Sequence, residues 1–229
     1  MDLLYFATRR LRFIQTLYES AVGPFRETKR QIAAGEPPYV DTRNPEDYDG
    51  EPAFLSEWED ADDAAMVVGH WCLCMVQATL QAYLRDCIGP LGSLWWNSSE
   101  LRRRIGRKQG NWFQRYRMLF LEDLGVDWQH GPVPLVDLEQ LNLTRDDLIH
   151  NIDMMSFNVK RVENHAEQFP IGLFTDDLWQ GLGIERVRVD EDRLVLAIHL
   201  VTKFCGWLEG IRCGYPQYIN KSISAEAQP

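Results

Sequence analysis

Apolar positions recur at helical spacing through most of the 229-residue chain and predict a protein built from helices. The first such pattern covers residues 2–34, with arginines largely on the opposite face. Pro24 falls inside it, so we expect this helix to be kinked or divided there. From Gly35 to Pro52 the chain collects Pro, Asn, Asp and Gly, which is typical of a long surface loop.

A second helix is predicted over residues 54–88, ended by Gly89-Pro90. Acidic residues gather in its first part, where the helix dipole favours them. The stretch from Met66 to Leu84 carries no formal charge, so we expect this helix to be central and buried. We interpret His70, near the start of that stretch, as a core histidine hydrogen-bonded within the fold.

Shorter helices are predicted in the middle of the chain. Asn97-Ser98-Ser99-Glu100 is a capping signal for a helix reaching about Arg107, and a second helix should run from Asn111 to Leu124, ended by Gly125. After Pro134, a ladder of leucines at spacing i, i+3 marks one face of a further helix, which we expect to continue to about Met155.

The C-terminal third is predicted to be less regular. We expect loop or short helix over residues 156–184, including His165, and assign no chemistry there. Residues 186–189 alternate charged and apolar, which predicts a short strand, and a last helix should cover 191–211 before a mobile tail at 216–229. The predicted fold is all-α: a single helical domain over residues 1–215, with two long antiparallel helices, shorter intervening helices and a C-terminal helix.

Net charge and cysteine usage narrow the function. A formal charge of −10 argues against a generic nucleic-acid binder, so any RNA contact must come from a local basic surface. No long uninterrupted apolar run and no signal-peptide pattern occur, and the five cysteines fall mostly within apolar stretches. We therefore expect a cytoplasmic protein with buried thiols and with no metal, cofactor or membrane partner.

One such basic surface is suggested between Glu100 and Arg117, where seven Lys or Arg accompany one acid and aromatic residues are interleaved. Basic and aromatic side chains together can hold single-stranded RNA by phosphate contact and base stacking. The alternative is a solvated helix face whose aromatic residues turn to the core. The candidate RNA-binding residues are Arg103, Arg104, Arg107 and Lys108.

The stretch from Leu143 to Asn151 carries the strongest candidate chemistry. Thr144 stands three residues before Asp147, the spacing of a capping box, so Arg145 and the residues after it should occupy a helix first turn, where backbone N–H groups favour anions. His150 follows Arg145 by five residues, a rotation of about 140° and a rise of about 7.5 Å. A second element, or a second copy of the chain, would have to close them into one pocket.

The pattern Arg-polar-x-x-x-His, late in a small helical protein, resembles the HEPN superfamily, many of whose members are metal-independent endoribonucleases. Here it reads Arg145-Asp146-Asp147-Leu148-Ile149-His150, after a lead-in at residues 137–143 that is also similar to bacterial members. The resemblance implies catalytic roles for Arg145, Asp146 and His150. One position departs from the family, because Asp146 stands where Asn or His is most frequent.

The resemblance also implies partners. It predicts a homodimer that cleaves RNA to a 2′,3′-cyclic phosphate and a 5′-OH, in a toxin–antitoxin or antiphage role, with a nucleotidyltransferase-like antitoxin as a possible partner. Two other functions stay open: a non-catalytic helical module that binds a nucleotide or a protein, and a plain dimeric scaffold. A looser match, Arg193 and His199, encloses only apolar residues, and we interpret it as part of a packed terminal helix.

Overall fold

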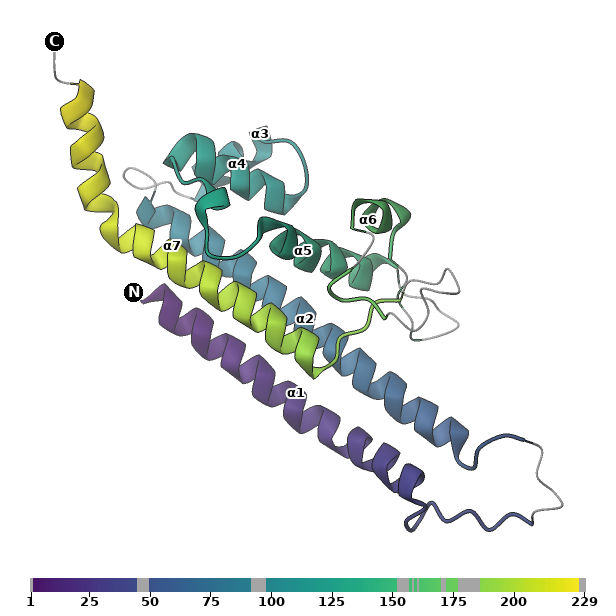
Figure 1. Cartoon of the computed structure of the whole chain (residues 1–229). Coiled ribbons are helices and arrows are strands. Elements are labelled where there is room, and N and C mark those ends of the chain that lie inside the picture. The colour runs from purple at the N-terminus through teal and green to yellow at the C-terminus, as the bar shows by residue number, and fades with distance from the viewer. Residues whose placement is uncertain are drawn as a thin grey trace. The chain divides into compact units, whose positions relative to one another are not determined.

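The computed structural model of the chain describes residues 2–44, 50–91, 98–151, 157, 159, 161–169, 172–176 and 186–226. These residues are mostly helical, with isolated β-bridges such as the one between Thr175 and Val187 and with no named strand among them. The prediction of an all-α fold is confirmed. The elements, labelled in Figure 1, are α1 (Leu3–Ala34), α2 (Leu55–Leu91), α3 (Ser98–Arg107), α4 (Trp112–Leu124), the 3₁₀ turn η2 (Trp128–His130), α5 (Leu135–His150), α6 (Glu163–Gln168) and α7 (Glu191–Glu226).

The chain divides into two compact units, and each long helix contributes to both of them. Unit 1 comprises residues 1–12, 75–143 and 196–229, and unit 2 comprises residues 13–74 and 144–195. The Arg145–His150 stretch therefore belongs to unit 2, whereas the basic stretch belongs to unit 1.

In unit 2 the segments of α1 and α2 run antiparallel. The ammonium of Lys29 donates to a carboxylate oxygen of Asp62 at 2.5 Å, and the sulfur of Cys72 lies 4.0 Å from the carbonyl oxygen of Ile14. A later residue of α1 thus pairs with an earlier residue of α2, as antiparallel helices require. The α1 helix continues through Pro24, so of the two expected effects, a kink or a division, the division does not occur.

The α2 helix is only partly buried. Leu73, Val76 and Leu80 are fully buried, but Trp71 is 69% exposed, so the uncharged stretch is not covered on every side. The helix also continues to Leu91, past the Gly89-Pro90 signal that we expected to end it.

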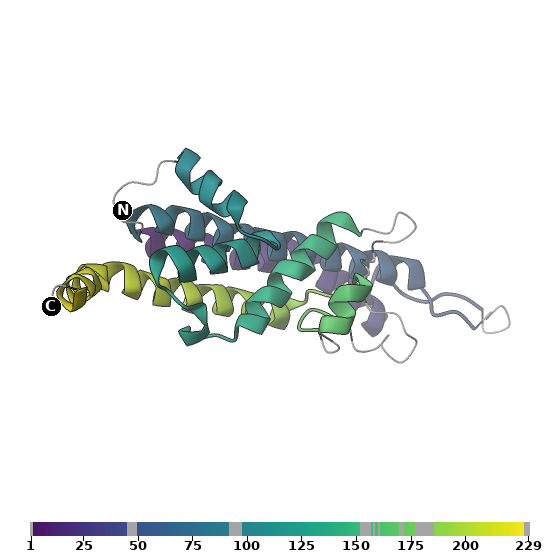
Figure 2. The same cartoon turned by 90° about the horizontal axis from the view of Figure 1, so that it is seen from above.

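In unit 1 the predicted helix over residues 111–124 is confirmed together with both of its ends. Asn111 and Gln114 form a reciprocal capping box, and Gly125 adopts the left-handed conformation at φ 67° that glycine favours at a helix end. The ring of Trp128 lies 5.1–5.3 Å from those of Phe113, Phe120 and Phe204 and is fully buried among them. Figure 2 shows α3 beside α4 in this unit.

The α5 helix corrects our prediction for the Arg145 region. It is one helix from Leu135 to His150, and Thr144 is buried in its interior instead of capping its start. The upstream leucine ladder and Pro134 start the helix, so the later Thr-x-x-Asp signal has no helix end to cap. Backbone N–H groups of Arg145 to Asp147 fall inside a helix and offer no anion site. The helix ends at His150, short of Met155, which lies outside the described residues.

Residues 186–189 keep the predicted alternation but form no strand. Val187 and Val189 are buried while Arg186 and Arg188 are partly exposed, and the backbone bonds to residues 174 and 176 and to the carbonyl oxygen of Val159. The pairing consists of isolated bridges instead of a continuous ladder. The last helix, α7, runs to Glu226, so residues 216–226 are helical where we expected a mobile tail.

Two helical segments are long and apolar enough to cross a membrane, judged by length and composition alone: Leu55–Ile88 and Glu191–Gly214. In their most apolar windows, 50% and 39% of the residues are buried inside the protein. The core helices of water-soluble proteins meet the same test, so the finding does not place the chain in a membrane.

Candidate functional site

The Arg145–His150 stretch forms the last turns of α5 in unit 2. A guanidinium nitrogen of Arg145 donates to a carboxylate oxygen of Asp146 at 2.8 Å, and these side chains are 31% and 30% exposed. The carboxylate therefore orients the guanidinium while both groups stay accessible to solvent. If Asp146 positions Arg145 and does not itself contact phosphate, it must bond to the guanidinium in this way.

His150 is exposed in the last turn of α5. Within the part of the chain that the structure describes, its side chain has no hydrogen-bond partner. The nearby helix end presents carbonyl groups, not the N–H groups that we expected, so the backbone there does not attract phosphate. Any anion near His150 must be held by side chains, of which Arg145 is the nearest cation in the sequence.

Asp147, between Arg145 and His150, is the buried anchor of this region. It is 1% exposed and both of its oxygens lie 3.0 Å from Nδ1 of His165, which belongs to α6. The side-chain amide of Asn151 and the backbone N–H of Val162 also donate to it, at 3.1 and 3.3 Å. Burial raises the pKa of the Asp147 carboxyl, and the neighbouring His165 imidazole acts in the opposite direction.

His165 is a functional candidate that our sequence analysis missed. An ionised carboxylate only accepts hydrogen bonds, so Nδ1 of His165 carries the hydrogen and Nε2 is left as the basic nitrogen. The side chain is 20% exposed. Arg161 fixes the short helix that carries it by donating to the carbonyl oxygens of His165 and Phe169 at 2.9 and 2.8 Å. Figure 2 shows α6 beside the end of α5.

No local signal could have revealed the Asp147–His165 pair. Eighteen residues separate the two, and the segment between them has no repeating pattern that predicts how it folds back. The pair is a tertiary contact, and neither residue type alone distinguishes it from an ordinary surface carboxylate and histidine.

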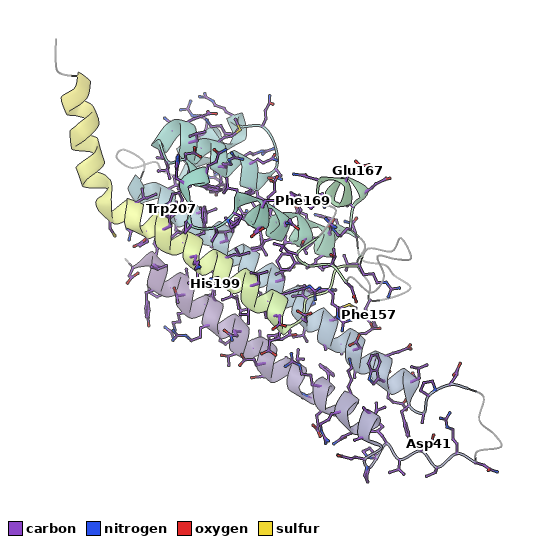
Figure 3. The ribbon with its side chains drawn as sticks, viewed as in Figure 1. Asp41, Phe157, Glu167, Phe169, His199 and Trp207 are labelled. Atoms are coloured by element: carbon purple, nitrogen blue, oxygen red, sulfur yellow. The ribbon has the colours of Figure 1, made fainter. Side chains whose placement is uncertain are left out.

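An apolar pocket of about 270 Å³ lies on the side of α5 opposite to the Asp147–His165 pair. It is lined by residues of α2, of the last turn of α5 and of the segment that follows: Val67, His70, Trp71, Cys74, Leu148, Ile149, Phe157 and Val159. Leu148 and Ile149 stand three and four residues after Arg145, so the pocket shares the Arg145 side of the helix. Phe157, labelled in Figure 3, is 60% exposed at its mouth.

His70 is buried in the wall of this pocket. Its Nε2 lies 3.1 Å from the carbonyl oxygen of Val187 and donates to it, because a carbonyl can only accept. Burial lowers the pKa of His70 to about 4, so the ring is neutral near pH 7. These contacts agree with our interpretation of His70 as a core histidine.

The basic stretch in unit 1 is partly neutralised by α4. Arg104 donates to Asp123 at 2.6 Å, and Lys108 forms ion pairs with Glu122 and Asp123. Arg103 and Arg107 are exposed. Trp95 and Trp96, which precede the stretch, lie outside the described residues.

The interleaved aromatic residues of this stretch face mainly inward. Phe113 and Tyr116 are buried, so they cannot stack on RNA bases, and Trp112 is partly buried against both rings. For these two side chains the structure favours the alternative in which the aromatic residues turn to the core.

The looser Arg193/His199 match does not place an arginine directly before an acidic partner, as Arg145 and Asp146 do. The guanidinium of Arg193 is paired with Asp190 and donates to the carbonyl oxygen of Thr175 at 2.7 Å. His199, labelled in Figure 3, is exposed on α7, whereas Leu194 and Ala197 of the same helix are buried. The match therefore lies in a packed terminal helix, as we interpreted it, with its histidine on the exposed face.

The described residues hold no group of three His, Cys, Asp or Glu side chains placed to bind a metal ion. The five cysteines are free thiols, of which Cys72, Cys87 and Cys205 are buried. No protein-family model, curated protein or solved structure matches this chain. Its function must therefore be inferred from the arrangement of its own residues.

Proposed function

We propose that this protein is a metal-independent endoribonuclease of the HEPN type. The observation that carries the proposal is an exposed histidine, His150, five residues after an arginine whose guanidinium is already oriented by Asp146. An imidazole and a positioned cation are the groups that RNA cleavage needs from a protein, because RNA brings its own nucleophile in the neighbouring 2′-OH.

In the proposed reaction, an imidazole removes the proton of the 2′-OH, and the 2′-oxygen attacks the adjacent phosphorus. Arg145 stabilises the charge that builds on the phosphate oxygens, for which a planar guanidinium is well suited. A second proton donor protonates the departing 5′-oxygen. The products are a 2′,3′-cyclic phosphate and a 5′-OH, as the HEPN resemblance implies.

Two imidazoles are available for the second proton transfer. One is the His150 of a second copy, because a two-fold dimer would bring two motifs into one cleft. The other is His165 of the same chain, whose Nε2 is the basic nitrogen once Asp147 holds Nδ1. We propose the homodimer as the active form, in the cytoplasm, in a toxin–antitoxin or antiphage role with a nucleotidyltransferase-like antitoxin as partner.

A second candidate function is a non-catalytic helical module that binds a nucleotide. The apolar pocket beside Arg145 favours it, because such a pocket could hold a ligand without any reaction. Cleavage separates the two functions.

The decisive experiment incubates purified protein with single-stranded RNA, with and without EDTA. We expect cleavage in both conditions, with 2′,3′-cyclic phosphate ends, and its loss in His150→Ala. His199→Ala is the matched control, since it removes another exposed histidine from a long helix and should leave cleavage unchanged. Light scattering should show a dimer for all three proteins. Cleavage that stops with EDTA, or that survives in His150→Ala, contradicts the proposal.

A further inference from the structure

We propose that the apolar pocket between α2 and the end of α5 binds one unpaired base of the RNA whose phosphate is contacted by Arg145. This inference rests on the proposed function, because it takes RNA as the ligand. It adds a base-recognition site to a motif that by itself contacts only the sugar–phosphate backbone.

The size and surface of the pocket suit a flat, uncharged ring. Its volume of about 270 Å³ is slightly below the ~300–1,000 Å³ range of pockets for drug-sized ligands, which favours a single ring system over a peptide segment. Trp71 and Phe157, 69% and 60% exposed, stand at its edge. Exposed aromatic rings beside an apolar hollow are what single-stranded RNA bases stack on.

The polar groups in the wall are neutral. His70 donates Nε2–H to the carbonyl of Val187, which leaves Nδ1 as an acceptor. Burial raises the pKa of the Cys74 thiol, which keeps its proton near neutral pH. A neutral acceptor and a weak donor fit the edge of a base better than a charged ligand, which would meet no opposite charge inside the pocket.

The charge needed for a nucleotide lies at the rim. Arg145 shares the pocket side of α5 with Leu148 and Ile149, and its positive charge acts on the Cys74 thiol in the pocket wall. An apolar slot with a cation beside it complements the two halves of a nucleotide, the uncharged base and the anionic phosphate.

The test uses the full chain carrying His150→Ala, so that RNA stays intact, and two hexameric probes: hexauridylate and an abasic ribose–phosphate hexamer. We expect hexauridylate to bind more tightly than the abasic probe. Adding Trp71→Ala should weaken hexauridylate binding by about 5- to 150-fold, since one stacked base contributes ~1–3 kcal/mol, and should not affect the abasic probe. Trp58→Ala is the matched control, because Trp58 is a partly exposed tryptophan of α2 outside this pocket.

The outcomes separate this inference from the proposed function. If His150→Ala binds hexauridylate equally well with and without Trp71, and the wild type cleaves RNA, the base pocket is overturned and the ribonuclease stands. Trp71-dependent binding of hexauridylate without any wild-type cleavage supports the pocket and overturns the ribonuclease. Failure to bind either probe overturns the base pocket, and absence of cleavage by the wild type as well overturns the ribonuclease. Trp71→Ala could instead change the mass measured by light scattering, while the parent variant binds both probes equally. That result would make the pocket face an interface between copies of the chain and would overturn the base pocket.

Discussion

The two candidate RNA-contact regions of the chain differ in what surrounds their cations. In α3 and the residue after it the positive charges are numerous, but Arg104 and Lys108 form ion pairs with acidic side chains of α4. At the end of α5 the charges are few, yet His150 is exposed and no described residue bonds its side chain. In an acidic protein a basic run is readily neutralised by neighbouring carboxylates, so the count of positive charges is a poor guide to where an anion binds.

The partners also differ in how firmly they hold each cation. Lys108 is 13% exposed between two carboxylates, so a phosphate would have to replace both in a partly desolvated site. Among the described residues, Arg145 has one carboxylate partner, on the next residue of the same helix. That geometry lets Asp146 keep orienting the guanidinium while its other N–H groups point to a ligand.

The largest effect expected from this difference concerns Arg145. Arg145→Ala should lower single-turnover RNA cleavage by about 10²–10³-fold, the scale of losing one preorganised donor to transition-state charge. Arg145→Lys should recover only part of the rate, because an ammonium lacks the planar fork of the guanidinium. Arg104→Gln, which removes a paired arginine of α3, should stay within about threefold of wild type. Equal losses in Arg145→Ala and Arg104→Gln would erase the distinction between the two regions.

The second prediction compares two histidines: His70, beside the motif, and His150, within it. His70 is buried and bonded, whereas His150 is exposed. The pKa of His70 falls from 6.5 in the unfolded chain to about 4 in the folded protein. Its neutral form therefore stabilises the fold fully above pH 6.5, and this contribution is lost as the pH drops toward 4. The shift corresponds to about 3 kcal/mol of unfolding free energy.

Urea unfolding at pH 7 and pH 4 measures this contribution. Wild type should lose more stability between the two values than His70→Gln, by about 3 kcal/mol. Cys72→Ala is the control, because it changes a buried side chain of the same helix without removing a group that titrates in this range. An equal pH dependence in wild type and His70→Gln would show that the ring is protonated inside the folded protein.

The sequence predicts those parts of the fold that depend on neighbours along the chain. The helix over 111–124 is right at both ends because Asn111, Gln114 and Gly125 act within their own turns. Thr144 misled us because a capping signal has no effect inside a helix that begins at Leu135. The acids that neutralise Arg104 and Lys108 come 14 to 19 residues later, and His165 comes 18 residues after Asp147. Contacts at such distances depend on how the chain folds back, which no local pattern specifies.

The smallest effect concerns the exposed arginines of α3 and uses two double variants. In Arg103→Gln/Arg107→Gln two exposed positions lose their charge, and in Arg104→Gln/Lys108→Gln the two less exposed positions that pair with Glu122 and Asp123 do. Each phosphate contact to single-stranded RNA contributes about 0.7 to the slope of log affinity against log salt. If α3 contacts RNA, the first variant should flatten that slope by at most about 1.4, and the second should leave it unchanged because the side chains of Arg104 and Lys108 are only 33% and 13% exposed. A slope that responds only to the second variant would mean that RNA displaces Glu122 and Asp123, and it would remove the contrast between α3 and the end of α5.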